Sequence, residues 1–145
     1  MQRYVTRKAW FAMNDPTLLS LDDLRALIER ALVRGGMSAE NAGPVAETML
    51  VCERDGVKSH GLLRLPGFVR SVQVGWANGR AQPRIVTMQA SMCVIDADNG
   101  FAQVCLTLTR DRLMDMARAT GTARRSRTRT GGASMTLTGS MIPGP

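Results

Sequence analysis

One segment of the sequence combines residue types that could transfer a proton and bind a carboxylate. His60, the only histidine, follows Ser59, precedes a glycine and lies four residues before Arg64. An imidazole exchanges a proton near neutral pH, and a guanidinium binds a carboxylate through two hydrogen bonds. If a helix begins at Ser59, positions i and i+4 lie on one face. The two side chains would then suit a small carbonyl compound that carries a carboxylate.

The same residues also have a purely structural interpretation. Ser59 would be the N-cap of a helix, and His60 a surface residue in its first turn. Pro66 would interrupt this helix and kink it. The residue types and their spacing leave both interpretations open.

Two segments resemble the malate/L-lactate dehydrogenase family. This group of NAD(P)-dependent oxidoreductases lacks a Rossmann fingerprint and includes ureidoglycolate dehydrogenases, diketogulonate reductases and cyclic-imine carboxylate reductases. Residues 53–69 are similar to the Ser-His-Gly segment of the family, and residues 94–103 to its Asp-Asn-Gly-x-x-Gln segment. The resemblance covers roughly residues 17 to 121.

The resemblance implies an enzyme that transfers a hydride between NAD or NADP and the C2 carbon of a small 2-oxo or 2-hydroxy acid, or a related imine. In such an enzyme His60 would be the general acid and base. Arg64 would bind the substrate carboxylate, and Ser59 would complete the substrate site and orient the imidazole. The resemblance also implies a homodimer in the full-length family.

The second motif receives no chemical role. Asp98, Asn99 and Gln103 match it, but a tight turn leading into a helix explains them nearly as well. The G-x-G-x-x-G and P-loop patterns are both absent from the sequence. The residues that bind the cofactor therefore stay unassigned, and so does the choice between NAD and NADP.

The positive charge lies at the two ends of the chain. The formal net charge is +7, of which +3 falls within residues 1–13 and +4 within residues 121–145, so the middle is neutral. This distribution argues against a protein that binds nucleic acid over its whole surface. Two alternatives to an enzyme stay open: a non-catalytic helical interaction module, and a nucleic-acid binder that uses its basic tail.

The cysteines and the hydropathy limit the other classes. Cys52, Cys93 and Cys105 are widely spaced, each within an apolar run, and the chain has one histidine, so we expect no metal site. Buried free thiols fit a reducing cytoplasm. No apolar run approaches the ~18 residues of a membrane-spanning helix, so we expect a cytoplasmic protein without a membrane partner.

The periodicity predicts an α+β fold in which an N-terminal helical subdomain precedes a β-hairpin and a packed helix. The apolar spacing predicts helices over 21–34, over 41–54 and over 101–120, with Leu108 on the apolar side of the last one. Ser38 or Asn41 would cap the second helix, and Asn41 is favoured because Pro44 would then lie in the first turn. The hairpin strands are expected at 85–88 and 92–96. The expected domains are a disordered extension (1–16), the helical subdomain (17–80), the start of an α+β nucleotide and substrate domain (81–121) and a disordered basic tail (122–145).

The tail lacks the composition of a folded segment. Residues 124–145 contain four arginines, no acid and little apolar mass, which predicts disorder. The resembled family continues at this point with a strand and a Ser-Asn-His-Phe-Gly segment that carries a second histidine. We therefore expect a truncated or frame-shifted product, read out of frame from Arg124, with little or no activity of its own.

Overall fold

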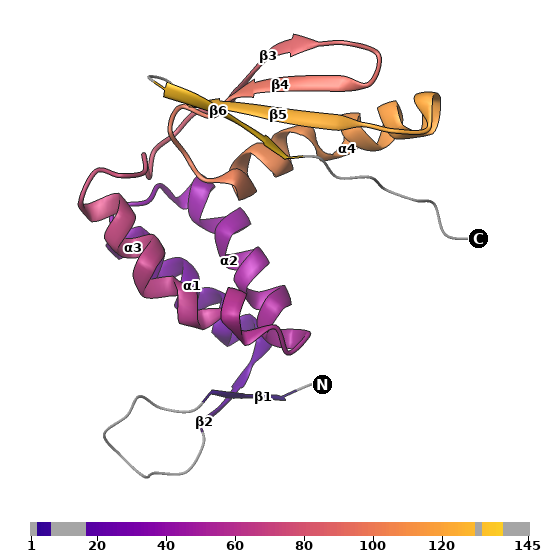
Figure 1. Cartoon of the computed structure of the whole chain (residues 1–145). Coiled ribbons are helices and arrows are strands. Elements are labelled where there is room, and N and C mark those ends of the chain that lie inside the picture. Colours follow the sequence, from indigo (N-terminus) through magenta and orange to yellow (C-terminus); the bar gives the residue numbers. More distant parts are fainter. Residues whose placement is uncertain (1–2, 7–16, 130–131, 138–145) are drawn as a thin grey trace. The chain divides into compact units, whose positions relative to one another are not determined.

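The chain forms the α+β structure that the sequence predicted, and it divides into two units (Figure 1). The computed structural model describes residues 3–6, 17–129 and 132–137. The first unit ends at Val74 and the second begins at Gly75, a few residues before the predicted boundary. No helix among the described residues has the length and apolar character to cross a membrane.

The elements are β1 (Arg3–Thr6), β2 (Thr17–Ser20), α1 (Leu21–Arg34), α2 (Ala39–Arg54), η1 (Lys58–His60), η2 (Leu62–Arg64), α3 (Leu65–Gln73), β3 (Arg84–Met88), β4 (Met92–Asp96), α4 (Ala102–Thr120), β5 (Arg124–Arg129) and β6 (Gly132–Leu137).

Helix α1 begins and ends where the sequence predicts. The Ser20 hydroxyl accepts a hydrogen bond from the Asp23 N–H at 3.0 Å and donates to the Asp23 carboxylate at 2.7 Å. This N-cap satisfies a backbone donor that would otherwise lack a partner in the helix. The buried side of the helix consists of Leu24, Ile28 and Leu32.

Helix α2 begins earlier than predicted. Its N-cap is Ser38, whose hydroxyl accepts the Asn41 N–H at 3.4 Å, so the prediction of Asn41 as the cap is wrong. The Asn41 side chain is buried instead. Pro44 lies inside the helix. It removes a single backbone hydrogen-bond donor, and the buried apolar residues on both sides of it hold the helix together.

Helices α1 and α2 form the apolar core of the first unit, and α3 packs against them without a buried residue of its own. Helix α3 packs on the turn between α1 and α2, where a Cβ at Gly35 would stand 2.9 Å from Cγ1 of Val69. The following Gly36 has a φ of +102°, which favours glycine. The buried apolar residues of this unit are Leu24, Ile28, Leu32, Met37, Ala42, Val45, Ala46, Met49 and Leu50.

The second unit is a mixed sheet in the order β3-β4-β5-β6. Strands β3 and β4 form the predicted antiparallel hairpin, with Ile85 opposite Ile95. Strand β5 runs parallel to β4, and α4 makes the crossover between them. A parallel pair needs such a crossover because a short turn cannot join two strands that point in the same direction.

Helix α4 packs on the sheet, and the sequence predicted only some of the residues on its buried side. Cys93, Ile95, Ala97 and Cys105 form the buried cluster, and Leu113 and Met116 pack against it. Leu108 is 44% exposed, so its predicted place on the buried side is wrong. Burial raises the pKa of the Cys93 thiol.

The burial of the thiols was predicted correctly for two cysteines. Cys93 and Cys105 are buried free thiols, whereas Cys52 is half-buried.

Both ends of the described chain contain strands where the sequence predicted disorder. Strand β1 pairs with β2, with Arg3 opposite Ser20, and the rest of residues 1–16 lies outside the described part. Strand β5 pairs with β4 and β6 over residues 124–129. Strand pairing uses backbone groups, so a segment without an apolar pattern can still join a sheet once a neighbouring strand is available. Residues 138–145 lie outside the described part.

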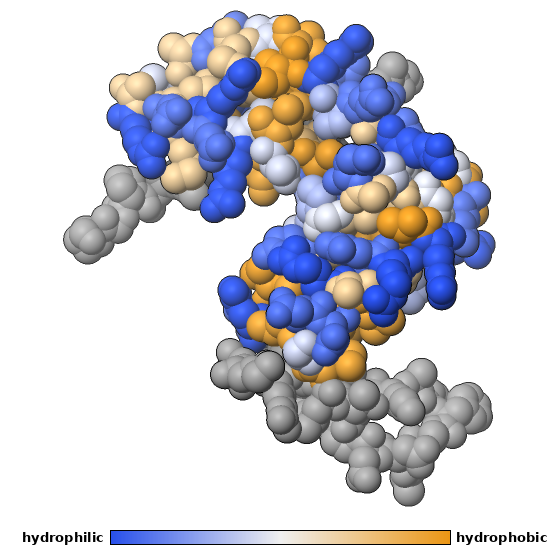
Figure 2. Space-filling view, turned by 180° about the vertical axis from the view of Figure 1, so that it is seen from behind, coloured by the Kyte–Doolittle hydropathy of each residue, from blue (hydrophilic) through white to orange (hydrophobic). Residues whose placement is uncertain are grey.

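The sheet unit also keeps apolar side chains at its surface. Figure 2 shows hydrophobic residues exposed on the unit that contains the sheet, at the top of the view. Val86 and Met88 of β3 and Leu106 and Leu108 of α4 are between 44% and 58% exposed. The core of this unit therefore buries only part of its apolar surface.

The core of the first unit supports a stability prediction. Leu24 is fully buried, whereas Leu27 on the same helix is 45% exposed. Leu24→Ala should lower the free energy of unfolding by about 2–5 kcal/mol because it leaves a cavity. The matched control Leu27→Ala should cost less than about 1 kcal/mol. Denaturant unfolding followed by circular dichroism measures both, and equal losses would contradict this account of the core.

Candidate functional site

The predicted site residues lie on two consecutive turns at the end of α2. Ser59 and His60 belong to the 3-10 turn η1 and Arg64 to the 3-10 turn η2, and all three are exposed. The prediction of one helix beginning at Ser59 is wrong, because Gly61 separates the two turns and α3 begins only at Leu65. His60 and Arg64 therefore do not lie one turn apart on a single helix.

The local backbone explains this difference. The His60 N–H donates to the Val57 carbonyl at 3.0 Å, and the Arg64 N–H donates to the Gly61 carbonyl at 3.0 Å. Both bonds close short turns of the 3-10 type. Pro66 lies in the first turn of α3, where a missing N–H costs nothing, so it does not interrupt a helix.

Ser59 and His60 interact directly. The Ser59 Oγ lies 3.0 Å from the His60 Nδ1. When the imidazole carries both protons, the Nδ1–H donates to the hydroxyl. The Nε2 atom is then the ring nitrogen that can exchange a proton with another molecule. Ser59 does not cap a helix, but it does contact the imidazole as predicted.

The acidic residue closest in sequence to this turn is already paired. The Arg54 guanidinium donates to both carboxylate oxygens of Asp55, at 2.8 and 3.3 Å. This hydrogen bonding lowers the pKa of the Asp55 carboxyl. Lys58, His60 and Arg64 follow within the next nine residues. The exposed turns are therefore suited to an anionic group more than to a cation.

The structure adds a residue that the sequence argument missed. Glu53, in the last turn of α2, is only 6% exposed. Its Oε1 accepts the Leu62 N–H at 2.7 Å. A Cβ added at Gly61 would stand 2.2 Å from the same oxygen. The sequence signal was a charged residue in the apolar register of α2, three residues after Leu50.

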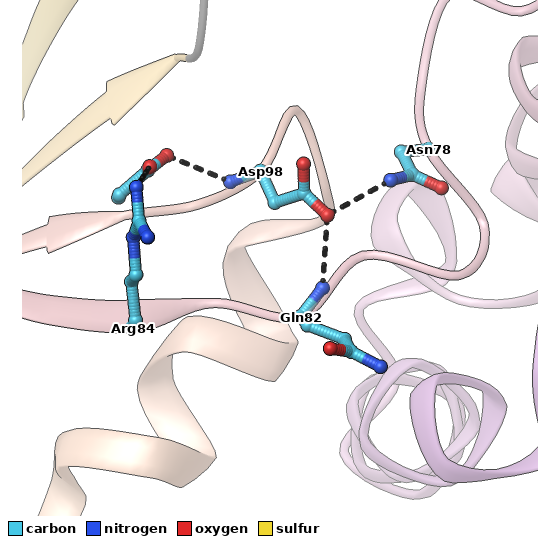
Figure 3. A network of polar contacts seen from close by, with 5 residues as sticks. Asn78, Gln82, Arg84 and Asp98 are labelled. Carbon is cyan, nitrogen blue, oxygen red and sulfur yellow. Dashed lines mark hydrogen bonds and ion pairs between the residues drawn. The ribbon is translucent and has the colours of Figure 1, made fainter.

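The second motif is part of a polar network within the sheet unit (Figure 3). Asp98 Oδ2 accepts from the Asn78 Nδ2 at 3.0 Å and from the Gln82 N–H at 3.1 Å. Asp98 and Asn99 have φ values of 48° and 54°, in the left-handed region, and form the tight turn that the sequence predicted. The Asp98 carboxylate thus holds the loop before β3 against the turn before α4, which favours the structural interpretation of this motif.

Metal ligands do not gather at either motif. Within residues 3–6, 17–129 and 132–137, no three His, Cys, Asp or Glu side chains lie close enough together to hold a metal ion.

Comparison with known proteins identifies the family. The sequence model of the malate/L-lactate dehydrogenase family matches residues 19–136. The chain therefore belongs to this family of oxidoreductases.

Several relatives are named as reductases of pyrroline-2-carboxylate or piperideine-2-carboxylate. The chain is 40% identical over 105 residues to the Delta(1)-pyrroline-2-carboxylate/Delta(1)-piperideine-2-carboxylate reductase of Pseudomonas syringae pv. tomato. The matched segment makes up 72% of this chain and 31% of that protein. It is 33% identical over 111 residues to the Delta(1)-pyrroline-2-carboxylate reductase of Ancylobacter novellus, covering 77% and 33% of the two chains. The chain thus spans about a third of the length of these relatives.

Solved structures support the same assignment. The crystal structure of the delta1-piperideine-2-carboxylate reductase from Pseudomonas syringae matches with a TM-score of 0.71 and 38% identity, over 75% of this chain and 33% of that one. Malate dehydrogenase from Pyrococcus horikoshii matches with a TM-score of 0.66 and 28% identity, over 75% and 31%.

The family match also bears on the tail. It extends to residue 136, past the Arg124 position at which the sequence suggested a change of reading frame. Strand β5 likewise pairs with β4 over residues 124–128. The frame change at Arg124 stays a prediction.

The contact between Gly61 and Glu53 yields a prediction about the turn. Gly61→Ala should destabilise the first unit, because the new Cβ would overlap the buried carboxylate. Gly67→Ala is the matched control, since nothing lies within 4 Å of a Cβ at that position. In the control, alanine should stabilise helix α3 by roughly 0.5–1 kcal/mol. Thermal unfolding compares the two variants, and a stable Gly61→Ala variant would contradict the observed packing.

Proposed function

We propose that this chain is part of a reductase that acts on small cyclic imines that carry a carboxylate at the carbon of the C=N bond. A 2-oxo acid, with C=O in place of C=N, is the related alternative. The observation that carries the proposal is the Ser59–His60 contact on an exposed turn, with Arg64 exposed on the turn that follows it. It is supported by relatives whose names specify pyrroline- and piperideine-2-carboxylate reductases.

His60 supplies the proton of this reaction. Reduction breaks the π bond of the imine, adds a hydride to C2 and adds a proton to the nitrogen, which gives a cyclic amine that keeps its carboxylate. An imidazolium with Nδ1–H directed to Ser59 would present its Nε2–H to the imine nitrogen. After the transfer the imidazole is neutral and regains a proton from water. In the reverse direction it accepts the proton.

Arg64 binds the carboxylate of the substrate. The guanidinium is exposed on the turn next to that of His60 and can form two parallel hydrogen bonds to a carboxylate. Such a contact fixes the orientation of the planar C=N group, and orientation is a large part of rate acceleration. Ser59 contributes by limiting the rotation of the imidazole.

NAD or NADP would supply the hydride. At the turn before α4, a Cβ at Gly100 would meet the Ala81 Cβ at 2.4 Å. This glycine therefore serves internal packing and does not leave space for a ligand. No described residue is assigned to the cofactor, and the homodimer of the complete enzyme stays a prediction.

The isolated 145-residue chain should show no turnover. It supplies a proton donor and a carboxylate-binding residue, whereas no cofactor-binding residue is assigned on it. Mixing the purified chain with NADH or NADPH and either Δ1-piperideine-2-carboxylate or pyruvate should leave the absorbance at the nicotinamide band unchanged. The Pseudomonas syringae reductase is the positive control for the assay. Steady oxidation of the cofactor by the purified chain would refute this prediction.

A chimera tests the role of His60. Residues 19–121 of this chain would replace the corresponding segment of the Pseudomonas syringae reductase. We expect the chimera to reduce Δ1-piperideine-2-carboxylate, and His60→Ala in it to lower kcat by roughly 10²–10⁴-fold, the range of a lost general acid. Lys58→Ala, an exposed residue of the same turn, is the matched control and should leave kcat unchanged. An active chimera in which His60→Ala is silent would exclude His60 as the proton donor.

A further inference from the structure

Glu53 is a buried ionisable residue to which the proposed reaction assigns no role. It lies in the last turn of α2 and is 6% exposed. Carboxylates are seldom buried to this extent without a hydrogen-bond partner, since burial removes them from water. Its side chain therefore needs a specific partner within the protein.

The partner is the backbone of the turn that carries the site. Glu53 Oε1 accepts the Leu62 N–H at 2.7 Å, a short distance typical of a charge-assisted hydrogen bond. Leu62 opens the turn η2 that ends at Arg64. The bond thus ties the end of α2 directly to the peptide that separates His60 from Arg64.

The same carboxylate explains the glycine that follows the histidine. An added Cβ at Gly61 would stand 2.2 Å from Oε1 of Glu53, and 2.7 Å from both Cδ and Cγ. These distances are too short for any side chain, so the Glu53 carboxylate occupies the space that a side chain at residue 61 would need. The Glu53 carboxylate therefore packs directly against Gly61, between the two turns.

We propose that Glu53 is the positioning residue of this site and that its carboxylate holds the Gly61–Leu62 peptide, which in turn sets the orientation of His60 and Arg64. This proposal rests on the function proposed above, because the orientation of His60 and Arg64 matters for catalysis only in that reaction. Glu53 itself is buried beneath the turn and does not touch the substrate. Its effect on the site depends on the reach of its side chain, because a shorter one cannot meet the Leu62 N–H.

The test uses the full 145-residue chain and nuclear magnetic resonance. The single histidine gives one set of imidazole signals, so the mobility of the His60 ring can be measured without ambiguity. Hydrogen exchange of the Leu62 amide reports the hydrogen bond to Glu53, and exchange of the Leu24 amide in the core reports the stability of the whole unit. None of these readouts needs catalytic turnover, so they stand even if the proposed reaction is wrong.

Two variants separate reach from charge. Glu53→Asp keeps the charge but withdraws the carboxylate, and should speed Leu62 exchange by about 10- to 100-fold relative to Leu24, the range expected when a hydrogen bond to a charged acceptor is lost. The His60 ring should become more mobile in the same variant. Glu53→Gln keeps an acceptor oxygen within reach but loses the charge, so it should speed Leu62 exchange and loosen the His60 ring much less than Glu53→Asp does. Glu47→Asp, on the exposed side of α2, is the matched control and should change neither.

Three results would overturn the proposal. Equal acceleration of the Leu62 and Leu24 amides in Glu53→Asp would show only a general loss of stability. Faster Leu62 exchange with an unchanged His60 ring would show a hydrogen bond that does not position the site. Equal changes of Leu62 exchange and His60 mobility in Glu53→Gln and Glu53→Asp would show that the length of the side chain does not determine the effect.

Discussion

The contact between the Glu53 carboxylate and the Gly61–Leu62 peptide is the constraint on which the geometry of the candidate site depends. A carboxylate withdrawn from water must be met by a donor, and the Leu62 N–H meets it at 2.7 Å. The backbone cannot continue as one α-helix and also turn this N–H toward α2. Two short turns result, and they leave Ser59, His60 and Arg64 exposed.

The two units place different demands on the sequence. The helical unit closes a continuous core in which Leu24, Ile28 and Met49 are almost fully buried. The sheet unit uses α4 to cover the cluster around Ile95 and leaves apolar side chains at the surface, among them Val86. Its polar network at Asp98 holds loop and turn together without needing a catalytic explanation. On the proposed function, the chemistry of this chain therefore belongs to the helical unit.

Patterns confined to one element predicted the structure well. Helix α1, the β3–β4 hairpin and the end of α4 at Thr120 were all predicted from local periodicity. Predictions that required knowledge of a neighbour were wrong. The burial of Leu108 is an example, because it depended on which side of α4 faces the sheet. The Asn41 cap was wrong for a local reason, since Pro44 lies inside α2 and not in its first turn.

The sequence by itself determined the family motif, the presence of a single imidazole beside a guanidinium, and the α+β order of the elements. It did so because residue type and short-range spacing carry that information. Only the tertiary structure decided that the two side chains lie on separate turns, that residues 124–129 form a strand, and that Glu53 lies beneath Gly61. Each of these depends on atoms that are distant in the chain or on a backbone partner, which residue type and short-range spacing do not specify.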